Sequence, residues 1–215
     1  MINRYEARLL EWQEKFRQNG REIVSQHGRY PVTADSRIPV TFFNKEYYVN
    51  LSGGRLYQQN GTPCPLQAMT QMMIYNHLER LQPDAVPAGQ MLRLGEIGGV
   101  KHMSRAIIAV SPPTEALIRA LDGDPTLGAR IIAAFCGAPA QVGDISFTLP
   151  AFRDVCYQYI YWAGEAEFPS TLTTFADANV TQFIHPEGAL LVGGIGVELI
   201  CQAMGIPYEK WSWET

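Results

Sequence analysis

Apolar residues recur every three or four positions in several segments of the chain, a period that predicts amphipathic helices. Residues 2–18 show it through Tyr5, Leu9, Trp12 and Phe16, and Asn19-Gly20 is the expected end of that helix. Residues 65–82 repeat the pattern around Met69, Met73, Ile74 and Leu78, and His77 lies beside their apolar stripe. Further helices are expected over 101–110, 114–121 and 125–136, and from Pro186-Glu187 to about Met204. His77 is interpreted as a core histidine bonded to a backbone carbonyl rather than as a ligand.

Other segments alternate apolar and polar residues with a period of two, which is typical of half-buried strands. Runs at 38–42, 47–51 and 55–58 predict an antiparallel meander with turns at Asn44-Lys45 and Ser52-Gly53-Gly54. Short strands are also expected at 91–94 and 145–149, the second ending at Pro150.

Residues 154–163 are bulky and largely apolar on both faces, which predicts an interior strand covered on both sides. Residues 171–175 are its expected partner, and residues 163–170 are the turn between them. Together these elements predict an α+β fold in which the helices at 66–81 and 187–203 pack on an antiparallel or mixed sheet. Residues 1–215 are expected to form a single domain, with the helix at 3–18 and the tail at 205–215 at its periphery.

Composition narrows the functional classes. The 215 residues are 47% hydrophobic and 18% charged, which suits a folded core, and the net charge of -4 argues against a nucleic-acid-binding protein. The apolar run Ala189–Ala203 contains Glu198 and Gln202, so we interpret it as a buried helix and expect no membrane span. The N-terminus has no signal-peptide pattern, and a cytoplasmic location is expected.

The four cysteines are far apart in the sequence, at Cys64, Cys136, Cys156 and Cys201. Structural zinc sites and iron–sulfur clusters use closely paired cysteines, so we expect neither a metal site nor an intrachain disulfide.

Candidate chemistry concentrates between Tyr157 and Glu187. The segment lacks the phosphate-loop and nucleophile-elbow motifs but is rich in acidic and aromatic side chains. Paired carboxylates bind hard cations or perform acid–base chemistry, although each acid could equally be a solvated, capping or ion-paired residue. Glu167 is predicted to be the least exposed of the four acids Glu165, Glu167, Asp177 and Glu187. The candidate ligand-binding residues are Trp162, Glu165, Glu167, Phe168, Asp177, His185 and Glu187.

The block Trp162, Gly164, Glu165, Glu167, Phe168, Pro169 and then Phe175 resembles a family of uncharacterised proteins, mostly of anaerobic bacteria and archaea, known as a domain of unknown function. The family pattern ends its short strand with Phe-Asp, whereas here the aspartate is displaced to Asp177. Two adjacent acids usually open the family's last helix, and here only Glu187 is present. Some relatives carry an added iron–sulfur segment like that of corrinoid methyl-transfer proteins. This chain lacks that segment, so the resemblance implies that such a role would need a partner.

Three functions follow as hypotheses. The first is a small-ligand-binding or accessory protein of anaerobic one-carbon or corrinoid-type metabolism, with its site near 162–187. The second is an enzyme that uses Glu165, Glu167 and Asp177 for metal-assisted or acid–base chemistry. The third is a subunit-interaction module, in which Trp211 and Trp213 contact this chain or a second copy, as in a homodimer. The expected partner is a small molecule or another protein; the sequence identifies no catalytic residue and no cofactor.

Overall fold

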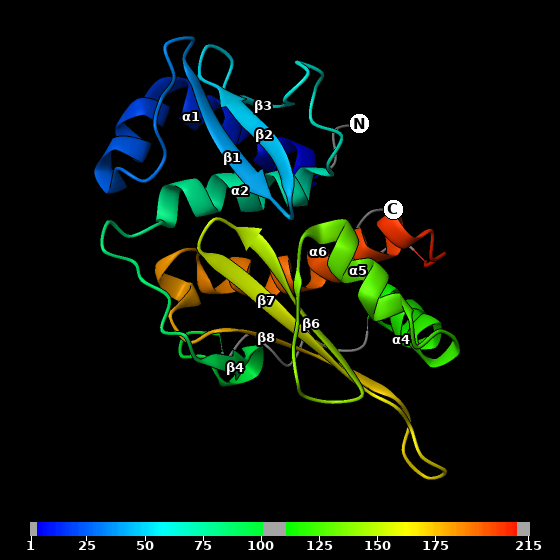
Figure 1. Ribbon diagram of the computed structural model, residues 1–215. Helices are drawn as coiled ribbons and strands as arrows, with labels where there is room; N and C mark the ends of the chain where they lie inside the picture. Colours follow the sequence, from blue (N-terminus) through cyan, green and yellow to red (C-terminus); the bar gives the residue numbers. More distant parts are fainter. Residues whose placement is uncertain (1–3, 101–110, 210–215) are drawn as a thin grey trace.

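The structure, a computed structural model, describes residues 4–100 and 111–209. The helix expected over 101–110 and the tryptophans Trp211 and Trp213 lie outside these residues. Two antiparallel sheets and the helices between and beside them make an α+β fold, as predicted (Figure 1).

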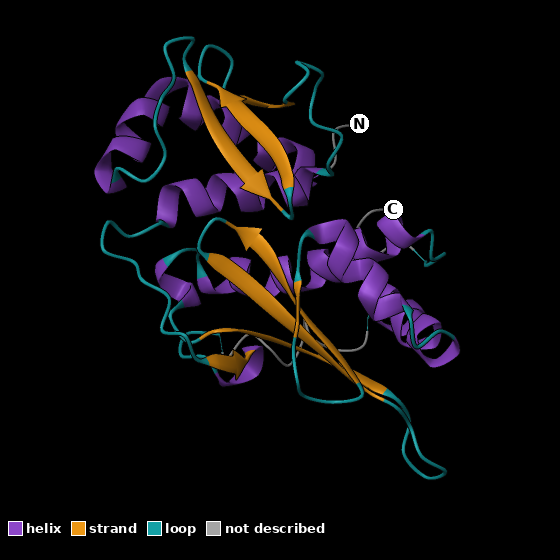
Figure 2. Cartoon of the chain, in the orientation of Figure 1, coloured by secondary structure: helices purple, strands orange, loops and turns teal. Residues whose placement is uncertain are grey.

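The smaller sheet has the strand order β1-β2-β3 and is the predicted meander. Its strands are β1 (Arg37–Phe42), β2 (Lys45–Asn50) and β3 (Arg55–Gln58). Phe43 and Asn44 both have positive φ and form the β1–β2 turn, one residue earlier than expected. Helices α1 (Arg4–His27) and α2 (Ala68–Arg80) cover one face of this sheet (Figure 2).

Helix α1 does not end at Asn19-Gly20, so that prediction is wrong. Gly20 is buried, and a Cβ on it would lie 2.4 Å from Leu51 Cδ2, so this glycine allows close packing inside the helix. The helix ends instead before Gly28, whose φ is +65°.

The larger sheet has the order β4-β8-β7-β6-β5, and the segment predicted as an interior strand is its central strand. Its strands are β4 (Met91–Arg93), β5 (Ala138–Pro139), β6 (Ile145–Phe152), β7 (Val155–Trp162) and β8 (Thr171–Asp177). Strand β6 continues past Pro150, where the register shifts, instead of ending there. Residues 163–170 are the predicted turn, and the β7–β8 hairpin projects from the rest of the protein (Figure 1).

Helix α6 (Pro186–Met204) packs on β7 through hydrogen bonds from tyrosine hydroxyls to helix carbonyls. Tyr157 donates to Ala189 O at 2.8 Å and Tyr159 to Gly193 O at 3.0 Å. A Cβ on Gly196 would lie 1.9 Å from the Tyr159 hydroxyl, so glycine is required for this approach. By length and composition this helix could cross a membrane. However, 61% of its most apolar 18-residue stretch is buried inside the protein, as expected of a core helix. Helices α4 (Pro112–Gly123) and α5 (Leu127–Phe135) lie beside it.

One hydrophobic core runs through both sheets, and α2 lies between them (Figure 1). The His77 ring of α2 stacks on Phe152 of β6 with centroids 3.9 Å apart. The amide of Phe43 donates to Ala151 O at 3.0 Å and joins the β1–β2 turn directly to β6. These contacts fix the relative position of the two sheets and of the surface between them.

Candidate functional site

The antiparallel hairpin separates the residues predicted to form one acidic site. Glu165 and Glu167 lie at the tip, where Glu165 and Phe168 exchange two backbone hydrogen bonds of 3.0 and 2.9 Å around a two-residue turn. Asp177 ends β8, six residues beyond Thr171, so the strand spans about 20 Å between them. The three carboxylates therefore do not converge on a common ion. Among residues 4–100 and 111–209, no three His, Cys, Asp or Glu side chains are grouped closely enough to hold a metal.

Burial also differs from the prediction. Glu167 is exposed, whereas Asp177 is only 7% exposed, so the prediction that Glu167 is the least exposed acid is wrong. A two-residue turn at the end of a projecting hairpin leaves Glu167 nothing to pack against. The Asp177 carboxylate accepts backbone hydrogen bonds from Ala88, Gly89 and Asn179, each 2.8 Å long. Asp177 thus fastens the loop before β4 to the end of β8.

The remaining candidates lie near the hairpin tip and at the start of α6. Trp162 and Phe168 are 49% and 71% exposed near the tip. His185 and Glu187 lie at the start of α6, where His185 Nδ1 accepts from the Glu187 amide at 3.3 Å. Close to the tip, the hairpin is held to α4 by a residue that the sequence did not indicate: Asp122 accepts hydrogen bonds from the hydroxyls of Tyr161 and Ser170.

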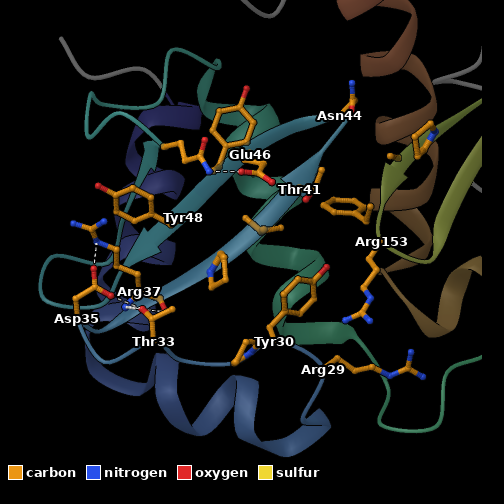
Figure 3. A pocket seen from close by; sticks show the side chains of 18 residues that line it. Arg29, Tyr30, Thr33, Asp35, Arg37, Thr41, Asn44, Glu46, Tyr48 and Arg153 are labelled. Carbon is orange, nitrogen blue, oxygen red and sulfur yellow. Dashed lines mark hydrogen bonds and ion pairs between the residues drawn. The ribbon is translucent and has the colours of Figure 1, made fainter. Parts of the chain in front are cut away.

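A cleft of about 620 Å³ lies elsewhere, between the smaller sheet and the corner that joins β6 to β7 (Figure 3). Such a volume is within the usual range for small-molecule sites. None of the seven sequence-predicted candidates lines it. Its walls come mainly from three separate parts of the chain, which are residues 29–35, the hairpin of β1 and β2, and residues 150–153; Gln59 also lines it.

Arginines give this cleft a positive end in a chain whose net charge is -4. Arg29 forms a 3.1 Å ion pair with Asp154 and also donates to Ala85 O. Arg153, exposed in the corner between β6 and β7, has no ion pair or hydrogen-bond partner among the described residues. In Figure 3 the Arg153 side chain extends toward Tyr30 and Arg29, while the Arg29 side chain extends away from Tyr30; both charges are near enough to act on the Tyr30 hydroxyl.

A buried hydrogen-bond chain fixes Tyr30 in the cleft wall. His77 Nδ1 lies 2.9 Å from Phe183 O, and His77 Nε2 lies 2.8 Å from the Tyr30 hydroxyl. Burial lowers the pKa of His77 to about 3, so the ring is neutral at pH 7. Because a carbonyl only accepts, Nδ1 carries the proton, and Nε2 accepts from the Tyr30 hydroxyl. Burial also raises the pKa of Tyr30, so this residue is a neutral hydrogen-bond donor to His77.

The sheet side of the cleft is polar and partly acidic. Arg37 pairs with Asp35 at 2.9 Å and stacks over the Tyr48 ring at 4.3 Å. Opposite Thr41 on the neighbouring strand is Glu46, whose carboxylate accepts from Gln59. Pro39 and Pro150 add apolar surface to the cleft, whereas Phe152 is only 2% exposed there. No single stretch of sequence contains this combination, which explains why motif spacing did not reveal it.

The sequence profile of a known family matches residues 24–199. The chain belongs to the DUF3786 family, a domain of unknown function. The match includes the cleft residues from Arg29 to Arg153 and the whole β7–β8 hairpin, so both features lie within the DUF3786 domain. No match was found among curated proteins or among solved structures.

Proposed function

We propose that this protein binds a small organic anion in the cleft and acts as a cytoplasmic ligand-binding or accessory protein. The observation that carries the proposal is Arg153: its guanidinium has no ion-pair partner among the described residues, and it extends beside Arg29 into a 620 Å³ cleft. Guanidinium groups present a fork of N–H donors that matches the two oxygens of a carboxylate or phosphate.

The surroundings suit the same ligand. Arg29 is already held by Asp154 and Ala85, so its guanidinium is positioned before a ligand arrives. Tyr30 is fixed by His77, and the surface of Pro39 and Pro150 can cover the ligand's apolar part. A role in anaerobic one-carbon or corrinoid-type metabolism is a further part of the proposal, supported by the resemblance of the 162–169 block.

Titration of the full chain with sodium hexanoate, followed by amide NMR shifts, tests the proposed site. We expect shifts at residues 29–33 and 150–153, and an Arg153→Gln variant that binds at least tenfold more weakly. Arg119→Gln is the matched control, because Arg119 is an exposed arginine on α4 outside the cleft. It should bind like the wild type.

Three results would contradict the proposal. One is unchanged binding in Arg153→Gln. Another is a set of shifts confined to residues 162–170, which would return the site to the hairpin turn that the sequence favoured. Absence of hexanoate binding at any concentration up to tens of millimolar would also count against an anion site.

A further inference from the structure

The cleft has opposite chemistry at its two ends. Arg29 and Arg153 lie at one end, while Glu46 and Thr41 lie toward the other (Figure 3). Glu46 is exposed and faces Thr41 across β1 and β2, where Gln59 donates to one of its carboxylate oxygens. A ligand with a negative charge alone would meet the arginines favourably and this glutamate unfavourably.

The open edge of β1 adds hydrogen-bond acceptors to the Glu46 end. In a two-residue hairpin the residues flanking the turn exchange hydrogen bonds, so Phe42 and Val40 bond to β2. Pro39 and Thr41 therefore direct their backbone groups away from β2, toward residues 150–153 of the corner. Proline has no N–H, so Pro39 offers only a carbonyl oxygen.

The same edge is poorly suited to a peptide strand. The carbonyl of Arg37 accepts from Thr33, and the amide of Arg37 donates to the Thr33 hydroxyl. The amide of Phe43 is bonded to Ala151 O. With these groups occupied and Pro39 unable to donate, an added strand would find few partners, which favours a small molecule.

We infer that the ligand is bipolar, with an anionic group at Arg29 and Arg153 and an amine at Glu46 and the β1 carbonyls. The inference rests on the proposed function and specifies the class of ligand. Pro39 and Pro150 also line the cleft and add apolar surface to it, which suits a short apolar chain between the two charged groups of the ligand. A linear ω-amino acid has this composition.

The test compares 6-aminohexanoate with hexanoate, which lacks only the amine, on the full chain by NMR titration. We expect 6-aminohexanoate to bind at least tenfold more tightly. Glu46→Gln should abolish this advantage by weakening the binding of 6-aminohexanoate without weakening that of hexanoate, and Arg153→Gln should weaken both ligands. Glu22→Gln, an exposed glutamate of α1 outside the cleft, is the matched control and should keep the wild-type preference.

The outcomes separate this inference from the proposed function. Two outcomes would overturn the bipolar ligand and leave the anion site standing, provided that hexanoate binding depends on Arg153. In one, 6-aminohexanoate binds no more tightly than hexanoate. In the other, it binds more tightly but keeps that advantage in Glu46→Gln. Failure of both ligands to bind overturns the proposed function, and the inference with it.

Discussion

At the scale of the residue, His77 connects the cleft wall to the core of the protein. Its ring is 1% exposed, stacks on Phe152, and bonds to the Phe183 carbonyl and the Tyr30 hydroxyl. The interpretation of His77 as a core histidine bonded to a backbone carbonyl is thereby confirmed. That interpretation was accessible from sequence because His77 lies beside an apolar helical stripe. Its second bond, to Tyr30, joins residues 47 positions apart and had no local signal.

Protonation of His77 should make stability depend on pH. Burial lowers its pKa in the folded protein to about 3, against about 6.5 in the unfolded chain. The stabilising contribution is therefore complete above pH 6.5 and is lost as the pH falls toward 3. From pH 7 to pH 5 the free energy of unfolding should drop by about 2 kcal/mol on account of this group, since one proton contributes about 1.4 kcal/mol per pH unit.

Urea denaturation of the wild type and of His77→Gln at pH 7 and pH 5 measures this contribution. The variant should be less stable at pH 7 and show a smaller loss between the two pH values. Some loss will remain, because burial also lowers the pKa of His27. His185→Gln, a change at the start of α6, is the control. An identical pH dependence in wild type and His77→Gln would show that His77 accepts a proton at its ordinary pKa.

At the scale of the element, the β7–β8 hairpin has a free tip and an anchored end. The tip acids are exposed, and Asp177 at the other end accepts three backbone hydrogen bonds. Asp177→Ala should lower the free energy of unfolding by about 2–3 kcal/mol, because the carboxylate is nearly buried and its three donors would lose their acceptor. Glu167→Ala is the matched control on the same hairpin and should change stability by less than about 0.5 kcal/mol. Chemical denaturation compares them, and equal small changes would mean that Asp177 is no anchor.

The hairpin also shows which features of a structural element can be predicted from the sequence. Bulky residues along 155–162 correctly indicated the central strand, but the prediction that both of its faces are covered is wrong. Val155, Tyr157, Tyr159 and Tyr161 are buried on one face, whereas on the other Cys156 and Gln158 are half-buried and Trp162 is exposed. The same reasoning could not assign burial to Glu167 or Asp177. Whether an acid is solvated or bonded depends on what the neighbouring loop brings to it, here the amides of Ala88 and Gly89. Likewise, Gly20 resembles a helix end in sequence, and only its packing on Leu51 explains why the helix continues.

At the scale of the whole molecule, the cleft results from the way two sheets are joined. Three parts of the chain meet there because Phe42, His77 and Phe152 pack together beneath the cleft. These parts are residues 29–33, strands β1 and β2, and residues 150–153. Sequence patterns predicted each sheet's strands but not the junction, since the contacts that form it join residues 75 to 110 positions apart. The candidate site was therefore sought in the one segment dense in polar residues, and the cleft was missed.

The junction predicts how the protein unfolds. Because a single hydrophobic core includes residues of both sheets, the two sheets should unfold together in one transition, with equal calorimetric and van't Hoff enthalpies.

Phe152→Ala should lower the free energy of unfolding by about 3–5 kcal/mol, since Phe152 is 2% exposed and packs against both Phe42 and His77. Differential scanning calorimetry should show the whole transition moving to lower temperature without splitting. Val142→Ala, at an exposed position, should leave the transition in place. Two resolved transitions in the wild type would mean that the sheets are independent units and that the cleft between them is not rigid. In that case the affinity of any ligand bound there would include the cost of bringing the two sheets together.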